Sequence, residues 1–287
     1  MNRHTAGSMV RKASRVARQP RLEARLLRTT PEALRGTDFA ARFTAVDAGD
    51  SPPATAAAPP NPLQAYFDAH ADGPGIWKWT HYFDIYHRHF AKFVGREVNV
   101  LEVGIFSGGS LGMWRAYFGA GCRIHGVDIA PECKAYEDDS TRIFIGDQAD
   151  RAFWRRVRAE APAMDIVIDD GGHQPEQQIV TLEETLPYLA PGGVFLCEDV
   201  HGRHNPFAAY VHGLAGELHA AESLHERDHG ELASRATGAQ AAIGSVHVYP
   251  YVTVIERNER PVAELQALRH GTEWQPFLGE RWAGRPS

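Results

Sequence analysis

The sequence has few cysteines and no long apolar run. Its 287 residues include three cysteines, Cys122, Cys133 and Cys197, an odd number without the spacing of a zinc site. We therefore expect reduced thiols, two of them in or near a sheet. No stretch approaches the roughly 18 apolar residues that cross a bilayer, and the N-terminus lacks the apolar centre of a secretory signal. These absences predict no membrane span and a cytoplasmic location.

An excess of positive charge is also missing. The net charge is −6, whereas a dedicated nucleic-acid-binding protein is usually basic, so we expect no nucleic-acid partner. The charge is unevenly distributed, because residues 1–36 carry about +7 and the remainder about −13. An organelle transit peptide and a mobile, partner-binding extension both fit this Arg-rich start.

Large apolar groups are scarce in residues 50–62, where Pro and Ala dominate, as in an extended linker. We predict that residues 1–62 form a flexible basic arm and linker, and that residues 63–287 form one domain. The hydrophobic content of 43% is sufficient for a sizeable core. Whether the chain forms a homo-oligomer is left open.

Apolar periodicity is abundant after residue 63. Aromatic residues between Tyr82 and Phe93 recur at three- and four-residue spacing, which predicts an amphipathic helix whose aromatic stripe packs in the core. Strand and helix signals then alternate. The expected strands are 98–103, 123–127, 142–145, 164–168, 194–197, 245–248 and 251–255, and the expected helices are 110–118, 150–160, 175–189 and 206–224.

This alternation predicts an α/β fold, a doubly wound, mostly parallel seven-stranded sheet with helices on both faces. The last two strands are separated only by the Tyr249-Pro250 turn region. Because no crossover helix fits there, they must run antiparallel, which gives the sheet a terminal antiparallel strand.

A glycine turn follows the first strand, in the run Glu102-Val103-Gly104-Ile105-Phe106-Ser107-Gly108-Gly109-Ser110. Glycines there let the backbone approach a ligand, and the N-terminus of the next helix favours a negative group. The spacing G-x-x-x-G-G differs from the G-x-G-x-x-G of nicotinamide enzymes. The turn predicts a nucleotide-like ligand, and a turn without a ligand is the alternative.

Acidic residues end the next two strands. Asp128 lies where dinucleotide sites place an acid on the ribose hydroxyls, and Gly146-Asp147-Gln148 follows the third strand in a place that suits an adenine edge. The alternative for each acid is a solvated side chain at a strand end.

The ends of strands four and five carry more acids, in Asp169-Asp170-Gly171-Gly172-His173 and Glu198-Asp199. Neighbouring parallel strands bring Asp170, Glu198 and Asp199 to one rim, where three carboxylates repel one another unless a cation neutralises them. Oxygen ligands favour Mg²⁺ or Mn²⁺ over zinc. Separate solvated acids and helix caps are the alternative.

His173 lies three residues beyond Asp170, on the loop before a helix. A lone histidine is more often a cap or a surface residue, but beside a metal and a cofactor a general base is favoured, because histidine exchanges protons readily near neutral pH. His201, on the neighbouring loop, is the rival.

Together these motifs resemble the metal-dependent sugar O-methyltransferases of macrolide biosynthesis, the mycinamicin-type enzymes in particular, over roughly residues 75–201. Lys78, His81 and Tyr82 also look like that family's lead-in to the first strand, and Gly172 stands where the family has serine. The resemblance implies the class I methyltransferase fold and S-adenosylmethionine as cofactor. It implies these roles: metal ligands Asp170, Glu198 and Asp199; base His173; cofactor-binding residues Tyr82, Glu102, Gly104, Ser110, Asp128, Asp147 and Asp169.

The function expected from this resemblance is methylation of a hydroxyl of a sugar or glycoside, in a natural product or an oligosaccharide, with Mg²⁺ or Mn²⁺. A catechol O-methyltransferase is the nearest alternative, because a catechol also chelates a cation through two adjacent oxygens. A metal-dependent oxygenase on the same fold, with Asp170, Glu198 and His173 or His201 around iron, is another, and a non-catalytic binding module is weaker.

Overall fold

The computed structural model of the chain describes residues 31–42, 60–221, 223–227 and 231–271. The chain divides into two compact units, Met1–Ala58 and Pro59–Ser287. Of the first unit, the described part is mainly the helix α2 (Pro31–Ala40), so most of the expected basic arm lies outside the described residues. The second unit begins with α3 (Pro62–Ala69), which Asn61 caps by accepting a hydrogen bond from the backbone N–H of Leu63.

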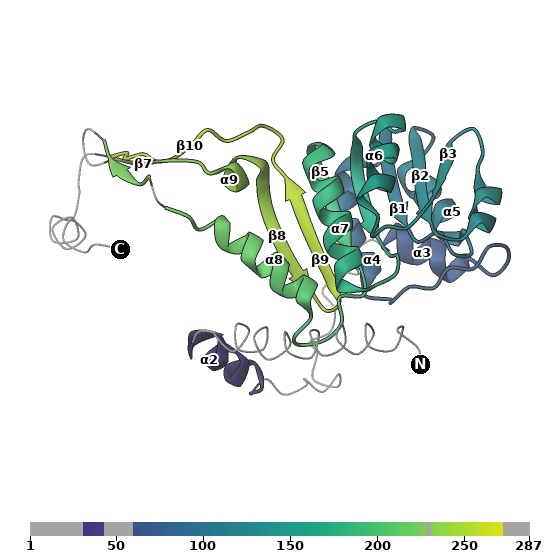
Figure 1. The fold of residues 1–287 in the computed structure, drawn as a ribbon, viewed down its shortest axis with the longest axis horizontal. Coiled ribbons are helices and arrows are strands. Elements are labelled where there is room, and N and C mark those ends of the chain that lie inside the picture. Colours follow the sequence, from purple (N-terminus) through teal and green to yellow (C-terminus); the bar gives the residue numbers. More distant parts are fainter. Residues whose placement is uncertain (1–30, 43–59, 222, 228–230, 272–287) are drawn as a thin grey trace, which may run out of the picture. The chain divides into compact units, whose positions relative to one another are not determined.

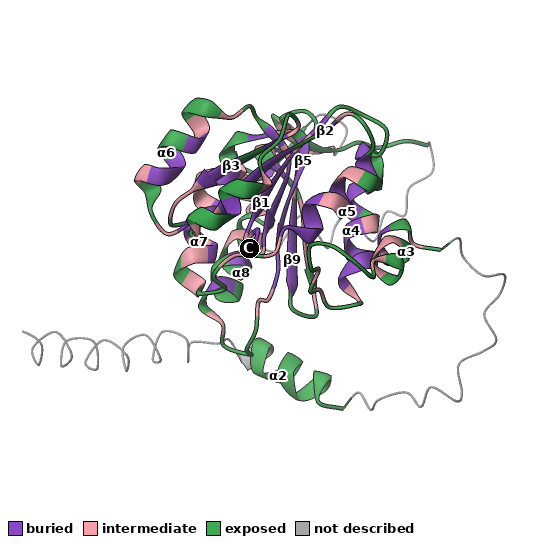
Figure 2. Ribbon diagram, turned by 90° about the vertical axis from the view of Figure 1, so that its right-hand side faces the viewer, coloured by how far each residue is buried: buried purple, intermediate pink, exposed green. Residues whose placement is uncertain are grey.

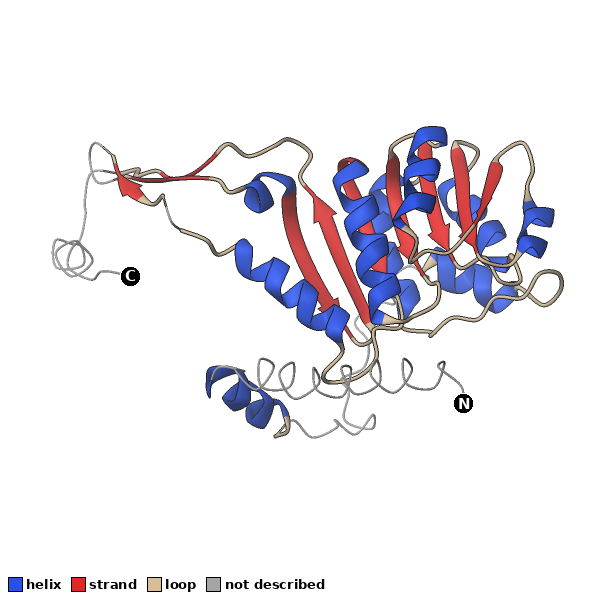
Figure 3. Ribbon diagram, in the orientation of Figure 1, coloured by secondary structure: helices blue, strands red, loops and turns tan. Residues whose placement is uncertain are grey.

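The second unit is built on a seven-stranded sheet in the order β3-β2-β1-β4-β5-β9-β8. Its strands are β1 (Val98–Val103), β2 (Cys122–Asp128), β3 (Thr141–Ile145), β4 (Met164–Asp169), β5 (Leu189–Cys197), β8 (Ile243–Tyr249) and β9 (Val252–Arg257). The first five pair in parallel, while β9 runs antiparallel to both of its neighbours, β5 and β8. The predicted doubly wound sheet and its late antiparallel strand are confirmed (Figures 1 and 3).

Helices cover both faces of this sheet, and each face has its own apolar core (Figure 2). Because side chains alternate along a strand, Val194 and Leu196 of β5 enter one core while Phe195 and Cys197 enter the other. The first core is covered by α3, α4 (Tyr82–Phe90) and α5 (Gly109–Phe118), and the second by α6 (Arg151–Glu160), α7 (Pro175–Thr185) and α8 (Pro206–Glu217).

Two helix ends differ from the prediction. The predicted helix 175–189 ends earlier, as α7 gives way to a 3₁₀ turn at Leu186–Tyr188, because Pro187 lacks the backbone N–H that an α-helix requires. The predicted helix 206–224 was too long as well, since α8 ends at Glu217. After it the chain enters a second, three-stranded sheet that the sequence did not predict.

That sheet has the order β10-β7-β6 and consists of very short strands, β6 (His225–Glu226), β7 (Leu232–Arg235) and β10 (Glu264–Ala267). The short helix α9 (Gly238–Ala242) leads from it back to β8. Strands of two to four residues carry too little alternation to be recognised.

All three cysteines are free and buried, with Cys122 in β2 and Cys197 in β5, as expected. Among the described residues, no helix has the length and apolar character that a bilayer crossing requires.

The parallel strands end at one edge of the sheet, and ligands of open α/β sheets bind at this edge. The loops after β1, β2, β4 and β5 meet there.

Candidate active site

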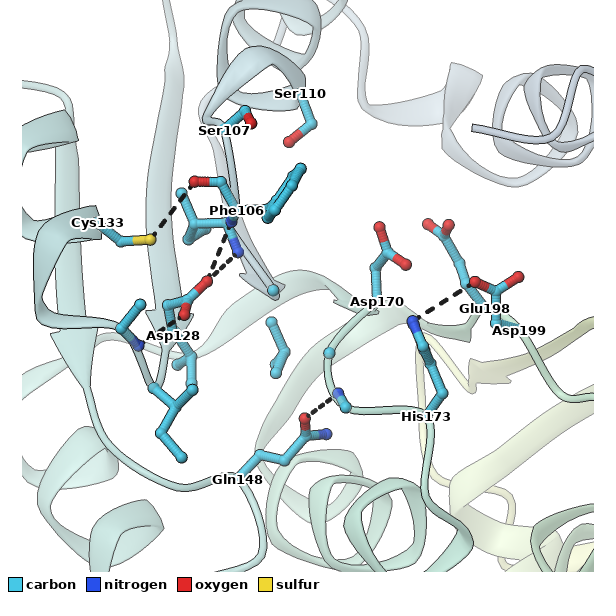
Figure 4. Close-up of a pocket in the computed structure, with 18 of the residues that line it drawn as sticks. Phe106, Ser107, Ser110, Asp128, Cys133, Gln148, Asp170, His173, Glu198 and Asp199 are labelled. Carbon is cyan, nitrogen blue, oxygen red and sulfur yellow. Dashed lines mark hydrogen bonds and ion pairs between the residues drawn. The ribbon is translucent and has the colours of Figure 1, made fainter. Parts of the chain in front are cut away.

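A cavity of about 840 Å³ opens at the carboxyl ends of the parallel strands. Figure 4 shows it in two halves, with Phe106 and Asp128 in one and Asp170, His173, Glu198 and Asp199 in the other. We call the half around Phe106 and Asp128 the donor half, and the half around Asp170, His173, Glu198 and Asp199 the carboxylate half. The cavity is large enough for a cofactor and part of a second molecule.

The donor half is built on the glycine turn between β1 and α5. Gly104 has φ +89° and Gly108, which precedes α5, has φ +76°, a region that other residues rarely adopt. A Cβ on Gly104 would lie 2.1 Å from the backbone oxygen of Asp170. Only glycine therefore lets the turn pass this close to the end of β4.

Asp128 holds this turn from the neighbouring strand. Its Oδ2 accepts hydrogen bonds from the backbone N–H groups of Ile105 (2.8 Å) and Phe106 (3.1 Å), and its Oδ1 accepts one from Ala130 (2.8 Å). Burial acts to raise the pKa of Asp128, but these hydrogen bonds outweigh it and lower the pKa. The carboxylate lines the cavity and also fixes the shape of the glycine turn.

Two other predicted cofactor residues lie behind the cavity wall. Glu102 is 0% exposed and accepts a hydrogen bond from the Ser110 hydroxyl (2.8 Å), while Ser110 itself lines the cavity. Burial raises the pKa of Glu102. Asp169 is 1% exposed, and burial raises its pKa to about 7. The structure thus places both acids as supports of the wall.

Gln148 lines the cavity and also supports its wall. Its Oε1 accepts from the backbone N–H of Gly172 (2.7 Å), and its Nε2 donates to Asp169 (3.0 Å). Asp147 also lines the cavity and is exposed.

Asp170, Glu198 and Asp199 all line the carboxylate half, but the ligand atoms that lie within 4.8 Å of one another are those of Asp170, His173 and Asp199, and Glu198 is joined to Asp170 through Lys78. A buried cation from the same chain lies among them: Lys78 Nζ is 2.5 Å from Asp170 Oδ2 and 3.0 Å from each oxygen of Glu198. The Lys78 side chain is 3% exposed. Burial acts to lower its pKa, but the charges of Asp170 and Glu198 outweigh it and raise the pKa.

Aromatic donors from the same segment complete this arrangement. Trp79 Nε1 (3.1 Å) and the Tyr82 hydroxyl (2.8 Å) donate to Asp199 Oδ1, and the Tyr86 hydroxyl donates to Glu198 Oε1 (2.7 Å). Tyr82, predicted to bind the cofactor, therefore contacts a carboxylate. Residues 78–86 thus hold all three of the predicted metal ligands.

Both candidate bases flank Asp199. His173 Nε2 lies 3.6 Å from Asp199 Oδ2, and His201 Nε2 lies 3.6 Å from Asp199 Oδ1. These distances are too long for hydrogen bonds but short enough for an ion pair when the ring is protonated. His173 and His201 are both exposed to the cavity.

Backbone strain is concentrated at this site. Among the described residues, the non-glycine residues with positive φ are Phe106 (+46°), His173 (+54°), Asp199 (+55°) and Tyr251 (+62°). The first three line the cavity, and Tyr251 packs edge-on against His201 with ring centroids 4.5 Å apart. Such strain is typical of functional sites.

An aromatic wall borders the carboxylate half. We define it as Trp79, His201 and Tyr251. The Trp79 and Tyr251 rings lie 5.5 Å apart and the Trp79 and His201 rings 6.4 Å apart. Trp79 is 50% exposed and Tyr251 42% exposed, so the wall offers ring surface to a ligand.

The residues present fit both a cofactor and a metal ion. Asp170, His173 and Asp199 each offer one ligand atom within 4.8 Å of the others, and carboxylate oxygens suit Mg²⁺ or Mn²⁺. The donor half offers a glycine turn, a helix N-terminus and Asp128, a set that suits an adenosine-containing ligand with a carboxylate.

Sequence reasoning missed Lys78, Trp79 and Tyr86 as parts of this site. It noticed the aromatic stripe of α4 but assigned it to the core, where Tyr86 does pack, at 0% exposure. The signal that could have found them is the tyrosine hydroxyl groups within the aromatic stripe and the lysine just before it, since buried polar groups need partners.

Known proteins resemble this chain in both sequence and fold. Residues 101–200 match the sequence profile of a family described as a methyltransferase domain. A tetracenomycin rhamnoside 3'-O-methyltransferase of Streptomyces olivaceus is 33% identical over 209 residues, which are 65% of this chain and 51% of that protein. The mycinamicin VI 2''-O-methyltransferase of Micromonospora griseorubida is 31% identical, over 60% of this chain and 47% of its own length.

Among solved structures, the MycE methyltransferase of the mycinamycin pathway, in complex with Mg and SAH, has a TM-score of 0.55 at 24% identity. The match covers 69% of this chain and 55% of that one, and it establishes the shared class I fold. The chain spans about half the length of the curated relatives it matches.

Proposed function

We propose that this chain, which carries a methyltransferase domain of the class I fold, transfers the methyl group of S-adenosylmethionine to a sugar hydroxyl of a glycosylated natural product with the aid of Mg²⁺ or Mn²⁺. One observation carries the proposal: the glycine turn and the carboxylate–histidine cluster line the same cavity. The names of the relatives, which methylate a rhamnosyl-tetracenomycin and mycinamicin VI, support the acceptor class.

In this proposal the donor half holds the cofactor. Gly104 allows close approach of the backbone, Ser110 lies at the start of α5, and Asp128 and Asp147 face the cavity from the ends of β2 and β3. Glu102 and Asp169 act from behind the wall by fixing Ser110 and the Gly171 loop.

The carboxylate half would hold the metal ion and the acceptor. When bound, S-adenosylmethionine supplies an electrophilic methyl group, and the ion, held by Asp170, Asp199 and Glu198, makes a nearby hydroxyl more acidic. The remaining task of the chain is proton transfer. His173 Nε2 accepts the hydroxyl proton, and Asp199 stabilises the imidazolium that results.

The aromatic wall would hold the sugar. A pyranose ring offers apolar C–H faces between its hydroxyl groups, and the exposed rings of Trp79 and Tyr251 are suited to pack against such a face. Because Trp79 also donates to Asp199, the wall and the carboxylate cluster are fixed relative to each other.

The metal is tested first. Asp170→Asn keeps the size of the side chain and removes its charge, so turnover should be lost while S-adenosylhomocysteine binds within about threefold of the unmodified protein by calorimetry. The unmodified protein should lose activity in EDTA and regain it with Mg²⁺. Full turnover after EDTA treatment and dialysis would remove the metal from the proposal.

The base is tested by a matched pair of variants. We expect His173→Ala to lower kcat by about 10²–10⁴-fold with little change in cofactor affinity, and His201→Ala to have a much smaller effect. The reverse order would assign proton transfer to His201.

The acceptor class is tested by the mass of the product. A rhamnoside should gain one methylene unit, and a catechol of similar size should not react. Turnover of the catechol alone would favour the second acceptor class, and a gain of one oxygen atom would indicate an oxygenase.

A further inference from the structure

Lys78 is a buried cation for which the proposed reaction has no role. Its side chain is 3% exposed and its partner Glu198 is 1% exposed. The ammonium group contacts Asp170 through one oxygen and Glu198 through both. A buried ammonium in this position adds to stability only while its carboxylate partners stay in place.

The charges explain why a cation is needed there. Glu102, Asp170, Glu198 and Asp199 are four acidic groups within one corner of the fold, and two of them are almost completely buried. Carboxylates so close repel one another. Lys78 is the lysine that contacts this cluster among the described residues, whereas His173 and His201 pair with Asp199 only when they are protonated.

In the proposed function a divalent ion draws on two of the same carboxylates, Asp170 and Glu198. Both oxygens of Glu198 already accept from Lys78, and Oε1 accepts from Tyr86 as well. Asp170 is engaged through Oδ2. An ion that draws on these carboxylates has to weaken the contacts of Lys78, and its charge is repelled by the ammonium.

We propose that Lys78 is a built-in counter-ion of the carboxylate cluster, and that the divalent cation competes with its ammonium group for Asp170 and Glu198. The inference rests on the proposed function, because the cation is the one that the proposed reaction uses. Lys78 keeps the carboxylates together while no ion is bound, and it weakens the binding of the ion. It is a positioning residue.

The experiment measures Mn²⁺ affinity directly. Free Mn²⁺ is followed by electron paramagnetic resonance in the absence of S-adenosylmethionine and acceptor. Lys78→Met removes the charge but keeps most of the length, and we expect Mn²⁺ to bind about tenfold more tightly or better. Lys134→Met is the matched control, because Lys134 also contacts a carboxylate, Glu137 Oε1 at 2.6 Å, but neither residue lines the cavity; its Mn²⁺ affinity should not change.

Thermal unfolding gives a second readout. Without metal, the Lys78→Met protein should unfold at a lower temperature than the unmodified protein. Addition of Mn²⁺ should raise the unfolding midpoint of both proteins, and the increase should be larger for Lys78→Met. A folded Lys78→Met protein with unchanged or weaker Mn²⁺ affinity would overturn the inference and leave the proposed function intact. If neither protein binds Mn²⁺, the metal of the proposed function fails, and this inference fails with it.

A measurement on the unmodified protein decides the matter if Lys78→Met does not fold. The chain has only four lysines, Lys12, Lys78, Lys92 and Lys134, so side-chain ¹⁵N labelling gives few ammonium signals, assigned by Lys→Arg variants of the other three. Mg²⁺ should shift the Lys78 signal and speed its exchange with water. A Lys78 signal that stays unchanged while Mg²⁺ binds would contradict the competition.

Discussion

His125 is a histidine in the middle of β2 that the fold keeps neutral. It is 8% exposed, and neither ring nitrogen has a hydrogen-bond partner among the described residues. Burial lowers its pKa to about 4, and the positive charges of Arg142 and Arg123 add to the effect. In an unfolded chain a histidine titrates near pH 6.5, so the two states bind protons differently.

This difference predicts a loss of stability in mild acid. Because the pKa is lower in the fold, the unfolded chain takes up a proton first as the pH falls below about 6.5, and the free energy of unfolding decreases until about pH 4. From pH 7 to pH 5 this residue should account for about 2 kcal/mol. Urea unfolding of His125→Leu should show a pH dependence that is smaller by this amount, whereas the exposed His212→Leu should behave as the unmodified protein. Equal pH dependence in all three would refute the account.

Tyr251 occupies a backbone conformation with positive φ, which glycine adopts more readily than tyrosine. It follows Pro250 in the β8–β9 turn and has φ +62°, and a turn with proline first and positive φ next is one that prefers glycine at the second position. Its side chain forms part of the aromatic wall. We infer that the strain is retained for ligand binding.

Tyr251→Gly should therefore separate stability from function. We expect the thermal midpoint to stay the same or rise, because the strain is relieved. The KM of the sugar acceptor should rise about tenfold, equivalent to about 1.4 kcal/mol, with unchanged affinity for S-adenosylmethionine. A lower midpoint together with an unchanged KM would mean that the ring serves packing alone.

At the scale of elements, the β1–α5 turn is tied to the end of β4. Gly104→Ala adds a Cβ in a left-handed conformation and places it 2.1 Å from the Asp170 backbone. Gly119→Ala is the matched control, because Gly119 has nearly the same φ, +91°, but nothing within 4 Å of its Cβ position.

The control should lose only the conformational cost, about 1–3 kcal/mol, because Gly119 has φ +91° and ψ −167°, a region that is essentially restricted to glycine. Gly104→Ala should lose more stability than this and also bind S-adenosylmethionine and Mn²⁺ more weakly, since both halves of the cavity move. Denaturant unfolding and calorimetry measure these changes. Equal losses of stability in the two variants, with normal cofactor binding, would show that the clash is relieved elsewhere.

The elements themselves were predictable where the signal was long and local. The expected strand 98–103 coincides with β1, and 142–145 differs from β3 by one residue, because both strands are rich in β-branched and other apolar residues that favour a strand. The sequence did not predict the short strands β6, β7 and β10. It also predicted one helix too long, because apolar residues continue after α8 ends at Glu217.

For the whole molecule, we propose that the second compact unit folds without residues 1–58. The second compact unit begins at Pro59, and α3, which follows it, contributes the fully buried Leu63 to the core. A chain that starts at Pro59 should unfold within about 2 °C of the full chain, which corresponds to less than 1 kcal/mol, and should bind S-adenosylhomocysteine equally well. A chain that starts at Gln64 removes Leu63 and should be measurably less stable.

If the chain that starts at Pro59 failed to bind the cofactor, this division would be contradicted. It would mean that the arm takes part in the site.

The sequence by itself determined the alternation of strands and helices, the glycine turn after the first strand and the acidic residues at the strand ends. These are local features: apolar periodicity fixes which faces are buried, glycine permits positive φ, and parallel strands deliver their ends to one edge. The structure places Asp170, Glu198 and Asp199 on the wall of one cavity.

Only the tertiary structure decided what balances these acids. Lys78 is 92 residues from Asp170 and 120 from Glu198 along the chain, and nothing in its neighbourhood in the sequence predicts either contact. The same holds for Gln148, which lines the cavity and also accepts a hydrogen bond from the Gly172 backbone. Such contacts arise from the packing of α4 and its preceding segment against the sheet, because desolvated polar groups take whichever partners the fold brings within reach.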